Sequence, residues 1–457
     1  MAEHACDVLV VGGGPAGLAL VLALRRHGSP LSVLVVERTS YELPGIGETL
    51  SPGARTLLEH LGVWEGFAAD GHLAAYGTSA AWGSPELATR DFLFTPFGTG
   101  WHLDRRRFDA RLADAAEAAG APLWRRSRVR RLGGDAAGGF GVEIDRDGRP
   151  ERVSARFLVD ATGKGAVLAR HLGGDRRVLD RQVALAATVA FEAEPPVETS
   201  TMVEAVELGW WYSAPIPGQQ LVVALVTDAD LAREHGLARE AAWHGQLEAA
   251  PHTSRRLAGG RLVAPPRVVA AHSACLVRTV GEGWLAVGDA AACHDPLSSS
   301  GIVRALDSGI RGARAIHAAL VLGDREALPA FDLEQGRAFD QYCATRAAYY
   351  QIEGRWPDGD LWRRRQRQVI LDPRALLAPN LLAALVPSRW PRALRLPADL
   401  RHLDARLLLE LVPHPRPAHE VVAEHRQRAT EPGSDLDVIL GLQWLLARGV
   451  LRLDAPG

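Results

Sequence analysis

The first forty residues contain two short apolar runs separated by one longer segment with helical spacing. Val8 to Val11 is apolar throughout, which is typical of a strand buried on both faces of a parallel sheet. Ala16 to Arg26 has the length and composition of a buried helix, and Val33 to Val36 is a second apolar run. This order predicts a strand, a helix and a strand at the start of the chain.

Later segments predict a helix and a hairpin. Residues His102 to Asp109 open an amphipathic helix that ends at Gly120. Val142 to Asp145 and Arg152 to Val159 are expected to be strands on either side of the Asp147-Gly148 turn. We expect the second of these strands to run back into the core.

Between residues 183 and 227 apolar and polar positions alternate, with breaks at Pro195-Pro196 and Pro217-Gly218. Alternation with a period of two predicts a mostly antiparallel sheet. Trp284 to Val287 then returns as a buried strand, and a long helix is expected from Ile302 to Leu322. The sheet is therefore expected to be an insertion between two halves of the first domain.

These elements predict the α/β class, α+β overall, with three domains. A Rossmann-like nucleotide-binding domain takes residues 1–180 and 265–350, and an antiparallel β substrate domain takes residues 181–264. Residues 351–457 are rich in arginine and leucine and are broken by prolines, with a last helical stretch at 436–448. We expect a small helical C-terminal domain there.

Composition narrows the classes of function. The chain of 457 residues is 47% hydrophobic and 23% charged, which suffices to bury a large core. A net charge of -2 gives no basis for binding nucleic acid or an anionic membrane, and no apolar run has membrane-spanning length. The four cysteines form no C-x-x-C pair and no metal-binding spacing. We therefore expect reduced thiols, no metal site and a cytoplasmic location.

Gly12, Gly14 and Gly17 follow the first predicted strand with the spacing Gly-x-Gly-x-x-Gly. In this spacing one glycine makes the turn, one lets backbone N–H groups approach a pyrophosphate, and one lets helix and strand pack closely. Glu37 ends the second strand, where a carboxylate accepts hydrogen bonds from ribose hydroxyls. Three glycines alone often mark a plain turn, but with strands, helix and acid in this order they predict a dinucleotide site.

Three separated motifs resemble those of the single-component flavoprotein monooxygenases with the p-hydroxybenzoate hydroxylase fold, a Rossmann-like fold of the glutathione-reductase type. They are Gly12-x-Gly-x-x-Gly17 with Glu37-Arg38, Asp104-Arg105-x-x-Phe108-Asp109 with Asp160-Ala-Thr-Gly163, and Gly288-Asp289. Within that superfamily, Gly47-Glu48-Thr49 and residues 209–217 and 288–302 resemble the branch of flavin-dependent halogenases. The same branch holds proteins that oxidise tryptophan in tryptophylquinone biogenesis, such as the maturation of quinohaemoprotein amine dehydrogenase.

The resemblance implies non-covalent FAD as the cofactor. The three glycines would bind its pyrophosphate, Glu37 the adenosine ribose, and Asp289 the ribityl chain or pyrophosphate, while residues 296–302 would run against the isoalloxazine ring. The residues expected to bind FAD are Gly12, Gly14, Pro15, Ala16, Gly17, Glu37, Arg38, Thr49, Arg105, Val129, Asp289, Pro296, Ser300, Gly301 and Ile302. O2 is the expected oxidant. NAD(P)H, or reduced flavin from a separate reductase, would supply electrons, because the chain has no second glycine motif.

The resemblance also implies oxygen chemistry. In the family, reduced flavin and O2 form a C4a-hydroperoxide whose distal oxygen attacks an electron-rich aromatic ring. Halogenases place a lysine in the segment that corresponds to residues 71–82, which has none here, and Ser298 stands where tryptophan halogenases have a glutamate. Trp210-Trp211-Tyr212 is more similar to the tryptophan-oxidising relatives. Lys164, the only lysine of the chain, is expected outside the substrate pocket.

These features predict an FAD-dependent monooxygenase that hydroxylates an electron-rich aromatic ring, such as a tryptophan indole on a peptide or protein, in cofactor or natural-product biosynthesis. The expected partners are an aromatic small-molecule or peptide or protein substrate and a flavin reductase, with no nucleic acid and no membrane. One alternative is a flavin-dependent halogenase. The other is a non-enzymatic, flavin-binding regulator whose helical tail contacts DNA.

Candidate catalytic residues follow from residue type and position. His294 stands beside the Asp-Pro turn as an acid or base, Ser299 lies in the segment expected along the flavin, and Trp211 lies in the tryptophan-rich strand. His72 and His102 are further candidates by residue type alone. The alternative for the tryptophan is ordinary strand packing, and for each histidine it is a surface or core position without chemistry.

Overall fold

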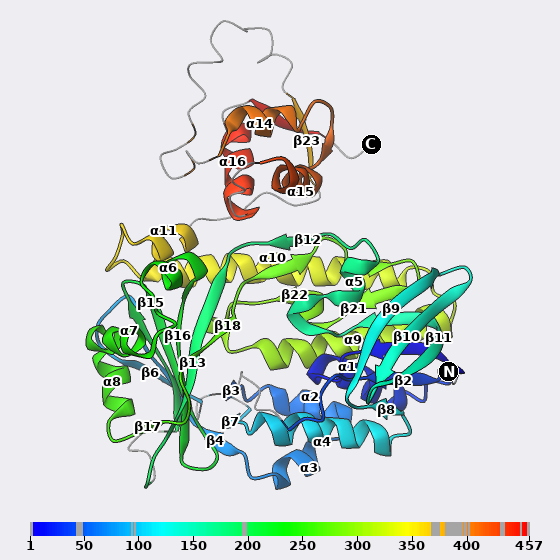
Figure 1. Cartoon of the computed structure of the whole chain (residues 1–457), viewed down its shortest axis with the longest axis horizontal. Coiled ribbons are helices and arrows are strands. Elements are labelled where there is room, and N and C mark those ends of the chain that lie inside the picture. Colours follow the sequence, from blue (N-terminus) through cyan, green and yellow to red (C-terminus); the bar gives the residue numbers. More distant parts are fainter. Residues whose placement is uncertain are drawn as a thin grey trace, which may run out of the picture.

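Two large sheets contain most of the strands in the described part of the chain (Figure 1). The computed structural model describes residues 3–42, 49–92, 95, 97–193, 199–366, 375–379, 396, 400, 403–429, 435–447 and 450–454. Gly47 and Glu48 of the expected motif and the expected break at Pro195-Pro196 lie outside these residues.

The first sheet has eight strands in the order β20-β21-β11-β1-β2-β8, with β10 and β9 continuing from β11. Strands β21, β11, β1, β2 and β8 run parallel to one another. The strands are β1 (Glu3–Val11), β2 (Val33–Val36), β8 (Leu123–Trp124), β9 (Ser127–Asp135), β10 (Gly139–Arg146), β11 (Arg149–Asp160), β20 (Val280–Gly281) and β21 (Trp284–Ala286). The central strands are apolar because both faces are covered, as the sequence predicts.

Helices α1 (Pro15–Arg26) and α9 (Gly301–Leu320) pack against each other over this sheet. Residues 16–24 of α1 are all buried, because the helix is enclosed by the sheet, by α9 and by α4 (Arg105–Ala118). Gly309 allows the close approach, since a Cβ at that position would overlap the backbone of Ala16. α2 (Ala54–Leu61) and α3 (Trp64–Ala69) extend the same core.

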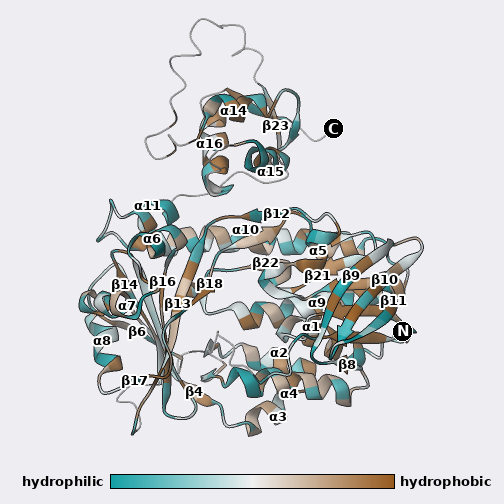
Figure 2. Cartoon of the chain, in the orientation of Figure 1, coloured by the Kyte–Doolittle hydropathy of each residue, from teal (hydrophilic) through white to brown (hydrophobic). Residues whose placement is uncertain are grey.

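The helix expected to open at His102 begins three residues later, which corrects the prediction. Residues Gly100–His102 form the short strand β7, which pairs with β3 (Thr49–Leu50) and β4 (Leu73–Ala75). Asp104 is the cap of α4, because its side chain accepts hydrogen bonds from the backbone N–H groups of Arg106 and Arg107. The expected hairpin is confirmed as β10 and β11, and Figure 2 shows hydrophilic and hydrophobic residues alternating along these strands.

The second sheet has eight strands in the order β17-β13-β16-β15-β14-β5-β6, with β18 beside β13. All pairs are antiparallel except β14 with β5. The strands are β5 (Gly77–Ala81), β6 (Ala88–Asp91), β13 (Gln182–Ala190), β14 (Ser200–Val206), β15 (Gly209–Ile216), β16 (Gln220–Asp228), β17 (Arg261–Leu262) and β18 (Arg267–Ala270). Because β5, β6 and β18 come from outside residues 181–264, the expected domain boundaries stay a prediction.

The two faces of the second sheet bury different aromatic residues. Trp211 packs against Trp243 on the side of α7 (Glu240–Gly245) and α8 (Pro251–Leu257), and α6 (Ala229–Glu234) lies close to that side. Trp210, its neighbour in β15, lies on the opposite face with Tyr350 of α10 (Ala327–Ile352) and Trp362 of α11 (Asp360–Arg365). Both tryptophans are fully buried. The sheet face that carries Trp210 points toward the segment before α9, because Leu297 of that segment also packs against it.

A small sheet connects the middle of the chain to the segment before α9. It has the order β12-β19-β22, formed by Arg176–Val178, Ala274–Leu276 and Ala292–Cys293. α5 (Val167–His171) precedes β12. β22 ends just before the Asp295 turn, so this sheet fixes the start of the segment that leads into α9.

The C-terminal residues form a separate core. Helices α14 (Ala405–Glu410), α15 (Ala418–Arg428) and α16 (Asp435–Ala447) pack with the antiparallel sheet β24-β23-β25 (Arg416–Pro417, Leu376–Pro379 and Leu451–Asp454). The helices were expected, but the sheet was not, because its strands have only two to four residues. Asp435 accepts a hydrogen bond from the backbone N–H of Val178 (2.9 Å), which ties α16 to β12. No helix in the described part of the chain is long and apolar enough to cross a membrane.

Candidate functional site

The turn between β1 and α1 leaves space at one glycine and none at the other two. Gly12 has a φ of +110°, and a Cβ there would overlap the carbonyl oxygen of Ala161. A Cβ at Gly17 would overlap the carbonyl oxygen of Gly12, whereas a Cβ at Gly14 would meet no atom within 4 Å. Gly14 also begins α1 without a side-chain cap. The first N–H groups of the helix are therefore open to an anion that approaches the turn.

Glu37 lies against the same turn and is almost fully buried. Its Oε2 accepts a hydrogen bond from the backbone N–H of Gly13 (2.7 Å), and its Oε1 accepts from the backbone N–H and the hydroxyl of Thr39 (2.8 and 2.7 Å). Tyr41 donates to the carbonyl oxygen of Gly13 (2.8 Å). The carboxylate is thus held in one orientation, and its oxygens retain lone pairs that can accept from a ribose.

Asp289 brings together charged groups from three segments. It lies in the short helix Gly288–Ala290, and burial raises the pKa of its carboxyl, while the nearby charges of Lys164 and Arg105 act in the opposite direction. Arg105 pairs with Asp109 (Nη2 to Oδ2, 2.9 Å), and the Lys164 ammonium donates to the carbonyl oxygen of Ala270 (2.5 Å). Lys164 therefore lies near Asp289 and bridges to β18.

The segment after Asp289 is a tight loop that leads into α9. Asp295 caps the short helix Pro296–Ser298 by accepting from the N–H of Leu297 (2.9 Å), and Ser299 follows with a φ of +46°. A positive φ is unusual for serine and marks a backbone position that the surroundings must hold. Ser300 receives a hydrogen bond from Arg304 (Nε to Oγ, 3.0 Å) and lies within 2.8 Å of the hydroxyl of Ser298.

A cavity of about 130 Å³ connects these two regions. Its lining includes Gly288, Asp289, His294, Gly301 and Arg304. The expected ribityl-binding acid and the expected flavin-contacting loop therefore open onto one space, although Asp289 and Gly301 belong to different turns.

Thr49 stands between the first sheet's loops and the second sheet. Its hydroxyl lies 2.8 Å from the hydroxyl of Thr201, 2.9 Å from that of Tyr212 and 3.5 Å from Nδ1 of His102. Burial lowers the pKa of His102 to about 4, with a further contribution from Arg256. This buried cluster joins the end of the Gly47-Glu48-Thr49 motif to strands β14 and β15 of the second sheet.

His294 is neutral at physiological pH. Burial, followed by the charges of Arg304 and Lys164, lowers its pKa to about 3. Its ring packs edge-on against Tyr342, with the ring centres 4.5 Å apart. A histidine with this pKa is a weak base, so its position favours a role in shaping the cavity over proton abstraction.

Several candidate residues lie apart from this space. Trp211 is on the far face of the second sheet, and His72 packs against Phe67 and Phe108 while accepting from the backbone N–H of Asp104 (3.2 Å). Val129 lies in β9, whose first residue pairs with the backbone of Glu37, and Arg38 is exposed at the end of β2. Among the described residues, no group of His, Cys, Asp and Glu could hold a metal ion.

Comparison with known proteins assigns the chain to a family. Residues 5–321 match the model of the FAD binding domain family. The chain belongs to this FAD-binding family. The putative FAD-dependent oxidoreductase LodB of Marinomonas mediterranea is 30% identical over 363 residues, which cover 79% of this chain and 96% of LodB. The tryptophan 2-halogenase of Chondromyces crocatus is 26% identical, covering 76% of this chain and 68% of that enzyme. Among solved structures, the chondrochloren halogenase CndH is similar with a TM-score of 0.73 and 25% identity, covering 87% of this chain and 92% of CndH.

This FAD-binding protein is an O2-dependent flavin enzyme that uses FAD and a supply of reduced flavin. The geometry fits the cofactor, because the turn keeps space at Gly14, leaves the start of α1 uncapped, and holds Glu37 beside it. The non-enzymatic alternative loses its basis, because the similar proteins are an oxidoreductase and halogenases.

Two cations near the site were not predicted. Arg304 is one helical turn after Ser300, so its spacing from the loop was the available signal. Lys164 was expected outside the substrate pocket, which stays a prediction; its segment Gly163–Gly165 contacts the short helix Gly288–Ala290 that carries Asp289. No local pattern marks that approach, because Lys164 and Asp289 lie on different segments.

Proposed function

We propose that this FAD enzyme is a monooxygenase that hydroxylates an electron-rich aromatic ring, such as a tryptophan indole carried on a peptide or protein. The observation that supports oxygen transfer is the segment 71–82, which forms β4 and β5 and contains no amine. A halogen carrier must be nucleophilic, and Arg90 in β6 cannot replace a lysine because its guanidinium stays protonated.

The only side-chain amine of the protein is already engaged. Lys164 donates a hydrogen bond to the carbonyl oxygen of Ala270, and its positive charge lowers the pKa of Asp289 against the effect of burial. This arrangement supports a role in closing the cofactor-binding region against β18. It does not favour a free amine along a substrate tunnel.

Bound FAD supplies the reducing electrons that activate O2, and the chain supplies the pocket. Hydroxylation replaces a ring C–H with C–OH using one oxygen atom of O2, while the other leaves as water with two electrons from the reductant and two protons. An indole is electron-rich without losing a proton. The low pKa of His294 is therefore compatible with this substrate class, because no base that titrates near neutral pH is needed.

A flavin-dependent halogenase is the second candidate. The tryptophan 2-halogenase and CndH are similar over most of the chain. Both candidates use reduced FAD and O2 and act on aromatic rings, so they differ in the atom that the product gains.

Product analysis separates the two. The purified enzyme would receive reduced FAD, O2 and a panel of indoles and tryptophan-containing peptides, with and without bromide. We expect a product that gains one oxygen atom in a yield that bromide does not change. The variant Lys164→Arg keeps the charge and removes the last side-chain amine. A brominated product in place of the oxygenated one would contradict the proposal, and its loss in Lys164→Arg would show that the lysine amine carries the halogen.

A further inference from the structure

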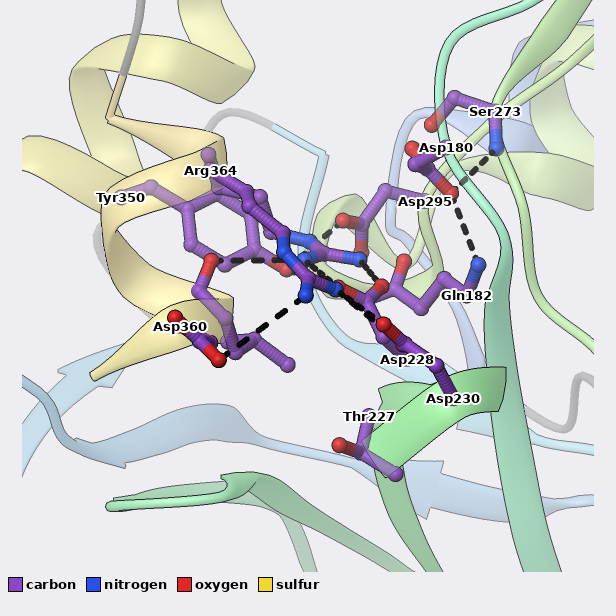
Figure 3. Close-up of polar contacts among 12 residues, drawn as sticks. Asp180, Gln182, Thr227, Asp228, Asp230, Ser273, Asp295, Tyr350, Asp360 and Arg364 are labelled. Atoms are coloured by element: carbon purple, nitrogen blue, oxygen red, sulfur yellow. Dashed lines mark hydrogen bonds and ion pairs between the residues drawn. The ribbon is translucent and has the colours of Figure 1, made fainter. Parts of the chain in front are cut away.

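A buried polar network connects the second sheet, helix α10 and the loop before α9 (Figure 3). Tyr350 and Arg346 are one helical turn apart on α10, and both reach the carboxylate of Asp295, which is 1% exposed. Asp295 begins the loop that leads to Ser300 and Gly301. The network therefore ends on the segment that leads to Gly301, which lines the cavity of about 130 Å³ beside Asp289.

The hydrogen bonds of the Tyr350 hydroxyl have only one possible direction. The hydroxyl lies 3.0 Å from Nε1 of Trp210 and 3.2 Å from Nε2 of Gln182, and both of these nitrogens can only donate. Its own hydrogen must therefore go to Oδ2 of Asp295, 2.7 Å away. The Tyr350 hydroxyl thus uses its one hydrogen as a donor and both of its acceptor positions. Burial raises the pKa of Tyr350 well above its usual value, so this hydrogen is present at all physiological pH values.

Arg346 holds two carboxylates at once. Its Nε donates to Asp295 (3.1 Å) and its Nη2 donates to Asp180 (2.7 Å). The Arg346 side chain is 9% exposed, and the side chains of Asp180 and Asp295 are 7% and 1% exposed. Charge-assisted bonds in such surroundings fix geometry strongly, because loss of one partner leaves a buried charge.

The Asp295 carboxylate also restrains the loop that follows it. Its Oδ1 accepts from the N–H of Leu297, two residues before the unusual φ of Ser299. Its backbone N–H donates to the hydroxyl of Tyr342 (2.7 Å), also on α10. The loop is thus held on both its main chain and its side chain by one helix.

We propose that Tyr350 and Arg346 are positioning residues that set the loop from Asp295 to Gly301 against the flavin, and that Tyr350 couples this loop to the sheet face carrying Trp210. The inference rests on the FAD site and is independent of whether oxygen or halogen is transferred. A shift at Trp210, on the sheet face against which Leu297 packs, reaches the loop through two hydrogen bonds.

The ring of Tyr350 is itself held by two arginines. The guanidinium groups of Arg346 and Arg365 lie 5.5 and 5.7 Å from its ring centre. Arg365 is in turn paired with Asp228 at the end of β16. The hydroxyl is therefore presented to Asp295 by a rigid frame, and its removal leaves that frame in place.

The test compares Tyr350→Phe with a matched control. Thr253→Val also removes a buried hydroxyl that donates to a buried carboxylate at 2.7 Å, that of Glu204, on the far side of the second sheet. Both variants lose a hydroxyl that donates to a buried carboxylate. Tyr350→Phe also removes the acceptor of Trp210 and Gln182, so we expect it to lose more thermal stability than Thr253→Val, and the comparison therefore rests on the flavin readouts. Only Tyr350→Phe should shift the visible absorption bands of bound FAD and raise the FAD dissociation constant about tenfold.

A second variant keeps the proposal decidable if Tyr350→Phe does not fold. Arg346→Lys retains the charge but can reach only one of the two carboxylates, so the same two flavin readouts should change by a smaller amount. The inference is overturned if Tyr350→Phe matches Thr253→Val in absorption spectrum and FAD affinity. It is equally overturned if Arg346→Lys, used when Tyr350→Phe is not recovered, leaves both readouts at wild-type values.

Discussion

At the scale of single residues, the three glycines of the first turn have different roles. Gly12 and Gly17 are required by the fold, because a side chain at either would overlap backbone atoms. Gly14 has open space in front of it, and its φ of -80° suits any residue. A side chain at Gly14 would therefore disturb a ligand and spare the fold, which separates cofactor binding from stability.

We predict that Gly14→Val weakens FAD binding at least about a hundredfold, or ~2.7 kcal/mol, while the apoprotein keeps its far-UV circular dichroism. Gly245→Val is the control, because a Cβ at Gly245 also meets no atom within 4 Å and lies on α7, away from the turn. Wild-type protein should carry one FAD per chain. A fully loaded, yellow Gly14→Val protein would contradict the assignment of this turn.

His294 gives a prediction about pH. The unfolded chain takes up a proton at this residue near pH 6.5, whereas the folded pKa is about 3. Acid therefore favours the unfolded state. The stability that the folded protein has while His294 is neutral in both states is fully present above about pH 7. It is lost as the pH falls from about 6.5 toward 3, because the unfolded chain then binds a proton that the folded chain does not. The slope is at most about 1.4 kcal/mol per pH unit.

We predict that His294→Gln makes the melting temperature less sensitive to pH between about 7 and 5, because Gln does not titrate. Thermal denaturation at several pH values measures this. His244→Gln, at an exposed histidine, is the control and should leave the wild-type pH profile unchanged. Identical pH profiles for His294→Gln and wild type would show that His294 is not buried as a neutral group.

At the scale of elements, helix α11 is attached to the second sheet by a buried ion pair. Arg365 donates to both oxygens of Asp228, with Nη1 3.0 Å from Oδ2, and both side chains are at most 5% exposed. Arg363, on the same helix, pairs with Asp360 in a setting where both are nearly half exposed. The helix thus offers a buried and an exposed arginine pair for direct comparison.

We predict that Arg365→Leu lowers the free energy of unfolding by ~3 kcal/mol, because Asp228 would remain buried with only the partly exposed Arg364. Arg363→Leu should change it by less than about 0.5 kcal/mol. Urea denaturation measures both. Equal losses in the two variants would mean that the buried pair does not anchor α11.

At the scale of the whole molecule, local patterns predict elements better than they predict neighbours. The bounds of β2 agree with the sequence analysis because the strand is apolar throughout, and α9 begins one residue earlier and ends two residues earlier than expected because its apolar positions recur at helical spacing. The pairing of β5 with β14 could not be predicted, since it joins segments more than a hundred residues apart and depends on long-range register.

The same limit applies to the site. The glycine turn was predictable because its requirement for small residues is local. Strand alternation shows that Trp210 and Trp211 face opposite ways, but only the fold shows that Trp210 faces the loop. The bond between Asp295 and Tyr350 spans 55 positions and has no sequence pattern.

The C-terminal core suggests a prediction about the intact chain. The described residues from 375 onward form their own apolar cluster, and none of these described residues is among those expected to hold FAD. We predict that a chain ending at Gln366 still binds one FAD per molecule, measured from the ratio of flavin to protein absorbance. A colourless but folded truncated protein would mean that this region takes part in cofactor binding.

The central claim is that the enzyme transfers oxygen to an aromatic ring. Its most direct test is turnover of a tryptophan-containing substrate under oxygen-18-labelled O2 with bromide present. Gly14→Val, which is expected to bind FAD weakly, is the negative control. We predict that the product carries one labelled oxygen atom and no bromine, and that Gly14→Val forms almost none. A brominated product without labelled oxygen would contradict the claim and identify the enzyme as a halogenase.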